Sequence, residues 1–262
     1  MNRILLLLVI LSTSTIIISG SITTNSRTLI LGLVLPHHDL AREVIINSAE
    51  KLAKLRPDVK YIAILSPNHY RPQSDTFTTT TVLKNFPIAV NVVREIKEEY
   101  PQMIMDEKLL NGEHGLYVPM TYLARYFPSA KFIPIAVTPY YTTEKLMTMA
   151  KILSGLLPPE TLFVASTDFS HNHNLSEAVL NDAMTIDAIR NFNFARLTKF
   201  DDNNIDSPPA MKTVMYIMEL RNADKWQTWQ ESHGSIITGN PNLVGTSYVS
   251  GVFYENALQQ IN

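Results

Sequence analysis

The chain of 262 residues contains no cysteine. This absence excludes disulfide bonds, thiolate nucleophiles, iron–sulfur clusters and cysteine-based zinc sites, so any metal must be held by histidine nitrogens and oxygen atoms. Charged residues make up only 18% of the chain, with 22 basic against 24 acidic. Because no clustered basic patch is present, we expect no nucleic-acid partner. The 45% hydrophobic content is that of a packed globular protein.

The longest apolar run lies at the N-terminus. Arg3 precedes an apolar stretch from Ile4 to Ile18, and small residues follow around Gly20. This arrangement is typical of an export signal, but a run approaching about 20 residues also suits a membrane anchor. We therefore expect residues 1–28 to be a signal peptide or membrane anchor with a linker. Residues 29–262 would then form an exported or anchored, extracytoplasmic domain, with membrane contact only through that segment.

Short apolar runs alternate with segments of helical spacing along the rest of the chain. Buried strands are expected at 29–35, 61–65, 131–137 and 161–166, and helices at 40–55, 91–100, 116–126, 143–157, 175–191 and 210–220. Parallel strands need such helical crossovers. The pattern predicts a single α/β domain with a mixed central sheet between helices, and two alternating C-terminal runs predict an antiparallel hairpin, 225–232 with 244–254.

Three local features refine this prediction. A threonine-rich segment, 75–83, is expected to form an exposed strand or hairpin. Asp39 is a candidate N-cap for the first helix. Ser207 is a candidate cap for the last helix, whose first turn would contain Pro208 and Pro209.

Histidines follow three of the predicted buried strands. His37 and His38 come after the first strand, His69 after the second, and Asp168 and His171 after the fourth. One histidine at a strand end is more often a capped or partly buried side chain than a ligand. Three that meet at the same edge of a sheet are hard to explain by packing, and ligands bind at that edge in open α/β folds. Imidazoles with a carboxylate suit iron(II), zinc or copper.

The residues alone leave open which carboxylate completes such a site. Asp39 is equally explained as a helix cap, and the dipole of the following helix favours an acid at Glu113 without any further role. Asp168 lies three residues before His171, so one would orient the other. Asp206 lies in a polar loop, where solvated aspartates are common.

A set of short segments resembles a known family. In order and spacing, LPHHDL, LSPNHY, EHGLYVPMTYL, PIAV, STDFSH and TSYVSG resemble the MEMO family, also called AmmeMemoRadiSam system protein B, from about residue 29 to 254. That family is similar in fold to the class III extradiol ring-cleaving dioxygenases. The resemblance implies one three-layer α/β/α domain with a mixed sheet.

Carried over residue by residue, the resemblance implies a metal site. His37 and His69 match the family's ligand histidines, and Asp168 and His171 match a motif in the same pocket. His171 is expected to be an acid/base residue and Asp168 its partner. The third ligand is a cysteine in some relatives and a glutamate in the dioxygenases. The equivalent loop here offers Asp206, which would complete the two-histidine, one-carboxylate set of non-haem iron(II) oxygenases.

Three further residues are expected to line this pocket. Glu113 and His114 match a Glu-His pair that opens the family's central helix. His38 departs from the family, where small residues are frequent at this position, and either narrows the pocket or adds a ligand.

The leading hypothesis is a MEMO-like metal-binding protein with oxygenase-like or redox activity on a small substrate. Iron(II) is the favoured metal, with copper and zinc as alternatives. A non-enzymatic module that binds a small molecule or peptide in the same cleft is a second hypothesis, and a zinc-dependent hydrolase is a third. The resemblance implies no general reaction, and one scaffold hosts several chemistries.

Overall fold

The computed structural model describes residues 29–71 and 75–255. The predicted signal peptide or anchor, residues 1–28, lies outside the described residues. Within the described ranges, no helix has both the length and the apolar character that a bilayer span requires.

The described residues form one eight-stranded mixed sheet, in the order β4-β3-β5-β2-β6-β1-β8-β7. The strands are β1 (Leu29–Leu35), β2 (Tyr61–Pro67), β3 (Thr78–Thr79), β4 (Ile104–Met105), β5 (Lys131–Val137), β6 (Thr161–Ser166), β7 (Lys225–His233) and β8 (Ser247–Glu255). The central strands β5, β2, β6 and β1 are parallel. β8 runs antiparallel to both β1 and β7, which confirms the mixed sheet and the C-terminal antiparallel pair.

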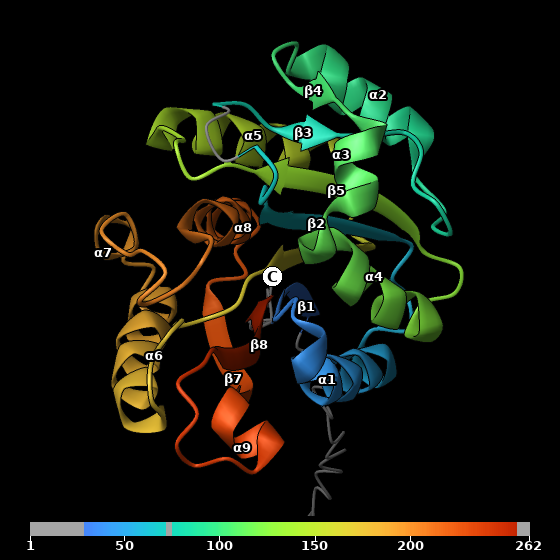
Figure 1. Ribbon diagram of the computed structural model, residues 1–262. Helices are drawn as coiled ribbons and strands as arrows, with labels where there is room; N and C mark the ends of the chain where they lie inside the picture. Colours follow the sequence, from blue (N-terminus) through green and yellow to red (C-terminus); the bar gives the residue numbers. More distant parts are fainter. Residues whose placement is uncertain (1–28, 72–74, 256–262) are drawn as a thin grey trace, which may run out of the picture.

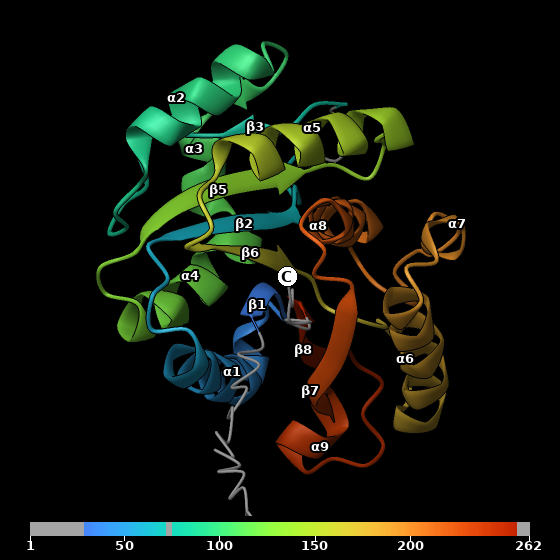
Figure 2. The same cartoon turned by 180° about the vertical axis from the view of Figure 1, so that it is seen from behind.

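Helices cover both faces of this sheet. They are η1 (Asp39–Ala41), α1 (Arg42–Leu55), α2 (Val90–Glu99), α3 (Glu107–Gly112), α4 (His114–Tyr126), α5 (Thr143–Leu156), α6 (Leu175–Arg190), α7 (Phe194–Leu197), α8 (Pro208–Leu220) and α9 (Gly234–Thr238). Figure 1 shows α1, α3 and α4 in front of the central strands, and Figure 2, from behind, shows α2, α5 and α8 on the opposite face. The predicted α/β/α layering is therefore confirmed.

The central strands are apolar throughout because both of their faces are buried. In β2, Ile62 and Ile64 belong to the core beneath α1 and α4, whereas Ala63 and Leu65 belong to the core beneath α2, α5 and α8. Successive side chains point to opposite faces of a strand, so one run of five or six apolar residues contributes to two cores.

The order of the strands in space differs from their order in the sequence. β1 and β2 are parallel strands joined by α1, but β6 lies between them and pairs with both. The carboxyl ends of β1, β6 and β2 are therefore neighbours. The segments that follow these strands carry most of the predicted site residues.

The start of α8 follows the prediction. The Ser207 side chain accepts a hydrogen bond from the backbone N–H of Ala210, and two prolines occupy the first turn. These prolines cost nothing there, because the first turn's N–H groups have no partner within the helix.

Two local predictions were wrong. Asp39 does not cap the first helix; the His38 side chain caps the short η1 instead, and Asp39 lies in the first turn and accepts a hydrogen bond from Tyr122. The segment 75–83 contributes only the two-residue strand β3, and both of its threonines are buried rather than exposed. The Thr79 hydroxyl donates to the Pro134 carbonyl, so hydrogen bonding allows a polar residue to be buried there.

Candidate metal centre

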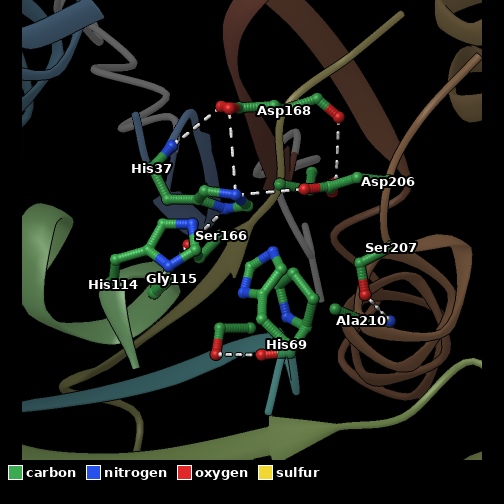
Figure 3. Close-up of polar contacts among 12 residues, drawn as sticks. His37, His69, His114, Gly115, Ser166, Asp168, Asp206, Ser207 and Ala210 are labelled. Atoms are coloured by element: carbon green, nitrogen blue, oxygen red, sulfur yellow. Dashed lines mark hydrogen bonds and ion pairs between the residues drawn. The ribbon is translucent and has the colours of Figure 1, made fainter. Parts of the chain in front are cut away.

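Three histidines from separate segments gather at the carboxyl edge of the parallel strands. His37 is the second residue after β1, His69 is the second residue after β2, and His114 is the first residue of α4. The ring centroids of His69 and His114 are 4.2 Å apart and stacked, and the ring of His37 lies edge-on to both at 5.2 and 5.3 Å. Figure 3 shows the three imidazoles together.

These three side chains form a candidate metal-binding group. Taking one ring nitrogen from each histidine, the three nitrogens lie within 4.8 Å of one another. Donor atoms around a tetrahedral zinc ion lie about 3.4 Å apart when each Zn–N bond is about 2.1 Å. The three nitrogens would therefore have to move closer together to bind one ion.

Glu113 fixes the orientation of His69. Its carboxylate lies 2.6 Å from Nδ1 of His69 and also accepts the backbone N–H groups of His69 and Gly115. Burial by itself raises the pKa of Glu113, but the hydrogen bonds and charge of His69 outweigh it and hold the pKa below its usual value. An ionised Glu113 can only accept, so Nδ1 of His69 carries the proton and Nε2 is left as the metal-binding atom.

His37 is oriented in a similar way by Ser166 at the end of β6. The Ser166 hydroxyl donates to the Gly115 carbonyl, and its oxygen lies 3.4 Å from Nδ1 of His37. Because the only hydroxyl proton is used in the first contact, Nδ1 of His37 is the donor in the second. Nε2 of His37 then faces the carboxylates of Asp206, at 3.0 Å, and Asp168, at 3.8 Å.

The two aspartates hold His37 rather than forming part of the three-histidine group. Asp168 accepts the backbone N–H of His37, and Asp206 accepts a hydrogen bond from the Thr167 hydroxyl. The second oxygen of Asp206 makes an ion pair with His37 but no hydrogen bond of good geometry. Its role as a third ligand stays a prediction.

The carboxylates change the protonation of His37. Burial by itself lowers the pKa of this buried imidazole, but Asp168 and Asp206 outweigh burial and raise the pKa to about 9. For His114, burial together with the charges of His69 and His37 lowers the pKa. His114 is therefore neutral at pH 7 and has a lone pair available, whereas a metal at His37 must displace a proton.

All of the predicted site residues except Glu113 border the same cavity; Glu113 is fully buried and does not contribute to the lining. This cavity of about 370 Å³ is lined by the three histidines and also by His38, Asp168, His171 and Asp206. His38 is exposed, and its Nδ1 accepts the N–H of Leu40. Nδ1 of His171 is buried without a hydrogen-bond partner. The contacts found for Asp168 join it to His37, so its pairing with His171 stays a prediction.

A larger and more open hollow of about 770 Å³ lies where β8 ends and β7 begins. Its described lining contains no histidine and consists mainly of exposed charged and amide side chains around Glu219 and Lys225. The smaller cavity is therefore the better candidate for chemistry.

The residues present fit a divalent metal. The site supplies three imidazoles, one of which is hydrogen-bonded to a buried carboxylate, and this arrangement orients metal-binding histidines in many proteins. Two residues of the cavity lining also have a buried polar atom without a hydrogen bond of good geometry: Nδ1 of His171, and Oδ2 of Asp206, which is ion-paired with His37. Such atoms are rare in folded proteins.

The sequence did not indicate every member of the site. His114 was expected to line the pocket, but its place in the metal-binding group depends on stacking against His69, which is 45 positions earlier in the chain. Glu113 was recognised as a helix-start acid, and it does accept the N–H of Gly115, but its hydrogen bond to His69 was not foreseen. Ser166 gave no signal because it ends an otherwise apolar strand.

The fold and this site define a mixed α/β protein with a histidine-rich candidate metal centre at the carboxyl edge of its parallel strands. A family model for Memo-like proteins matches residues 13–250, so the chain belongs to the Memo-like family. This match confirms the resemblance drawn from the sequence motifs.

Individual relatives agree with this assignment. The chain is 22% identical over 206 residues to a protein of Caldivirga maquilingensis described as a MEMO1 family protein, covering 73% of this chain and 72% of that one. It is similar in structure to an uncharacterized protein of Escherichia coli K12, with a TM-score of 0.57, 11% identity, and coverage of 86% of this chain and 99% of that one. At 11% identity, this second likeness shows the fold alone.

Proposed function

We propose that this protein binds one divalent metal between His37, His69 and His114 and uses it to act on a small molecule in the adjoining cavity. The observation that carries the proposal is the three-histidine group, in which a buried carboxylate holds one imidazole by Nδ1. A bound metal supplies Lewis acidity and, in the case of iron, reactivity toward dioxygen. An oxygenase-like or redox activity with iron(II) is our leading assignment.

The surrounding residues hold the ligands in place. Glu113 holds Nδ1 of His69 and leaves Nε2 as its metal-binding atom. Nε2 of His37 faces Asp206 and must lose a proton before it binds a metal. Asp168 and Asp206 surround Nε2 of His37 with negative charge, which would compensate the charge of a cation at this position. These contacts hold the side chains in place before any ion is present, and metal binding would replace the proton of His37.

His171 is the candidate acid/base residue. Its imidazole borders the cavity and Nδ1 has no hydrogen-bond partner, whereas its backbone N–H donates to the Asp202 carbonyl and fixes the loop. An imidazole that borders a ligand cavity is a common general acid or base.

A zinc-dependent hydrolase is the second candidate. It is favoured by the three histidines themselves, because three imidazoles with an open fourth position are a known catalytic zinc arrangement. Oxygen uptake with iron(II) and a panel of catechols distinguishes the two activities. Uptake by the wild type that is lost in His171→Ala supports the oxygenase assignment, and zinc-dependent ester hydrolysis without oxygen uptake supports the hydrolase.

Metal analysis tests the centre itself. Wild-type protein prepared under reducing conditions with added iron(II), cobalt(II) or zinc(II) is expected to retain about one ion per chain. His37→Ala, His69→Ala and His114→Ala should each weaken binding by at least about 100-fold, because three donors are the minimum for a stable protein site.

Two histidines provide matched controls. His38 borders the cavity but is exposed and outside the three-histidine group, and His173 lies near Asn203 instead. Their alanine variants should bind metal like the wild type. A wild-type protein that retains no metal under these conditions contradicts the proposal. Loss of binding in His38→Ala alone would show that the ligands were misassigned.

A further inference from the structure

The carboxyl group of Asp182 on α6 is buried outside both the three-histidine group and the cavity lining. The residue is 5% exposed, and its hydrogen bonds come from hydroxyl groups rather than from a basic side chain. Burying a carboxyl group is unfavourable, and burial raises the pKa of Asp182. The hydrogen bonds that it accepts must therefore compensate, and they show what this side chain holds.

One oxygen of Asp182 joins three separate parts of the chain. Its Oδ1 accepts the Ser247 hydroxyl at 2.7 Å and the Ser170 hydroxyl at 2.9 Å, and it lies 3.4 Å from the backbone nitrogen of Ser170. Ser247 is the first residue of β8, and Ser170 lies in the loop between β6 and α6. The carboxyl group therefore ties this loop to the helix and to the start of β8.

The same loop carries His171. Ser170 immediately precedes His171 in the chain. Two backbone hydrogen bonds pair this part of the loop with β8: the N–H of Phe169 donates to the Ser247 carbonyl, and the N–H of Ser247 donates to the Ser170 carbonyl. The side chain of Asp182 thus reinforces the backbone pairing directly before His171.

The chain is held again directly after His171. Asn172 has a φ of 58°, a left-handed conformation that asparagine adopts more readily than most residues. His173 then exchanges two backbone hydrogen bonds with Gly245, and the backbone N–H of His171 donates to the Asp202 carbonyl. The backbone around His171 is therefore fixed on both sides, which limits where its imidazole can lie.

We infer that Asp182 is a positioning residue for His171: by holding the hydroxyls of Ser170 and Ser247, it keeps the imidazole in its place at the cavity. The inference rests on the proposed function for the acid/base role of His171, but the positioning itself can be measured in the metal-free protein. Because all three contacts are made by Oδ1, the position requires a hydrogen-bond acceptor rather than a negative charge.

Nuclear magnetic resonance of protein with isotope-labelled histidine tests this inference without any metal. The ring signal of His171 is assigned by its absence from His171→Ala. In Asp182→Ala this signal should move toward the position of free histidine, because the loop is released. The His171 amide should also exchange with solvent roughly tenfold faster, as expected when two hydrogen bonds are lost. The ring signals of His69 and His114 should not move.

Two further variants separate the acceptor from the charge. Asp182→Asn keeps Oδ1 and removes the charge, so the His171 signal should stay close to its wild-type position. Ser170→Ala keeps the carboxyl group and removes the hydroxyl next to His171. It should therefore displace the His171 signal in the same direction as Asp182→Ala.

Asp187 provides a matched control on the same helix. It is exposed, and its carboxylate accepts hydrogen bonds from Asn191 and Arg196 instead of from the loop. Asp187→Ala should leave the ring signal and the amide exchange of His171 unchanged.

The role of Asp182 is refuted if Asp182→Ala folds and both His171 measurements equal those of the wild type. If Asp182→Ala does not fold, Ser170→Ala decides, and an unmoved His171 signal in that variant refutes the inference. A displacement in Asp182→Asn as large as that in Asp182→Ala contradicts the assignment of the effect to the acceptor.

Cobalt(II) binding distinguishes this inference from the metal proposal. Asp182→Ala should retain the wild-type affinity for cobalt(II), because the network does not hold the rings of the three ligand histidines. A loss as large as that of His37→Ala would show that Asp182 supports the whole site, which refutes a role specific to His171. A wild-type protein that takes up no cobalt(II) overturns the metal centre, while the positioning of His171 is still decided by the resonance measurements.

Discussion

Replacing Glu113 by glutamine should weaken metal binding without unfolding the protein. The carboxylate of Glu113 accepts three hydrogen bonds: from Nδ1 of His69 at 2.6 Å, and from the backbone N–H groups of His69 and Gly115 at 2.9 Å each. Glutamine keeps one acceptor oxygen, and its NH₂ group must face one of the three donors. His69 then loses the charged partner that holds the proton on Nδ1 and leaves Nε2 free.

The expected size of the effect follows from these contacts. Loss of a carboxylate that orients a ligand histidine typically weakens metal affinity by about 10- to 100-fold, or about 1.4 to 2.7 kcal/mol. The metal-free protein should also lose about 1.5–3 kcal/mol of stability, since one charge-assisted hydrogen bond is replaced by a poorly matched amide. The affinity is measured by competition with a chelating dye at fixed pH, and the stability by urea denaturation of the metal-free protein.

Asp106 offers a control that separates helix capping from metal binding. Its side chain caps α3 by accepting the N–H of Leu109 at 2.9 Å, and its ion-pair partner is Arg71 rather than a histidine. Asp106→Ala should lower stability by about 1 kcal/mol and leave metal affinity unchanged. The reasoning fails if folded Glu113→Gln binds metal as tightly as the wild type, because Glu113 would then be only a cap for α4.

Three other changes give direct tests. The first test uses the pKa of His37, which is raised from 6.5 to about 9. The protonated imidazole stabilises the metal-free fold fully below about pH 6.5, and this contribution is lost as the pH rises through 9. Urea denaturation between pH 6 and 9.5 should show this loss of stability in the wild type and a smaller loss in Asp206→Asn. An equal loss in the two proteins would exclude Asp206 as a cause of the raised pKa. Gly251→Ala should cost about 1–3 kcal/mol, because a Cβ at this position would lie 2.4 Å from the Trp226 ring. Gly155→Ala, on an open part of α5, should instead raise stability by about 0.5–1 kcal/mol. If the melting temperatures of the two glycine variants shift in the same direction, the packing described here is contradicted.

Much of the fold was predictable because the main signals are local. The strands β1, β5 and β6 begin and end as the apolar runs indicated, and α1, α5, α6 and α8 differ from the predicted helices by one or two residues at their ends. A strand buried on both faces must be apolar throughout, and a helix on a sheet must be apolar on one side, so these elements are visible in sequence. The segment 75–83 was misjudged because Thr78 and Thr79 are buried where they pair with β5, and the Thr79 hydroxyl donates to a carbonyl of that distant strand.

The site was predictable in part, for a related reason. A histidine that follows a buried parallel strand lies at the carboxyl edge of the sheet, so the positions of His37 and His69 followed from strand prediction alone. The start of α4 contains two adjacent candidates, Glu113 and His114, and nothing local shows which of them binds metal and which holds a neighbour. Their roles depend on the stacking of His114 on His69 and on the hydrogen bond of Glu113 to the same residue.

The sequence by itself determined the class of fold and the family. It also determined the type of metal donor, because a chain without cysteine and with histidines at several strand ends can hold a metal only through imidazole and oxygen. The tertiary structure alone decided which side chains meet. β6 lies between β1 and β2, and this placement brings Ser166 and Asp168 against His37. Hydrogen bonds between residues more than 100 positions apart depend on the order of strands in the sheet, and no local pattern of residues encodes that order.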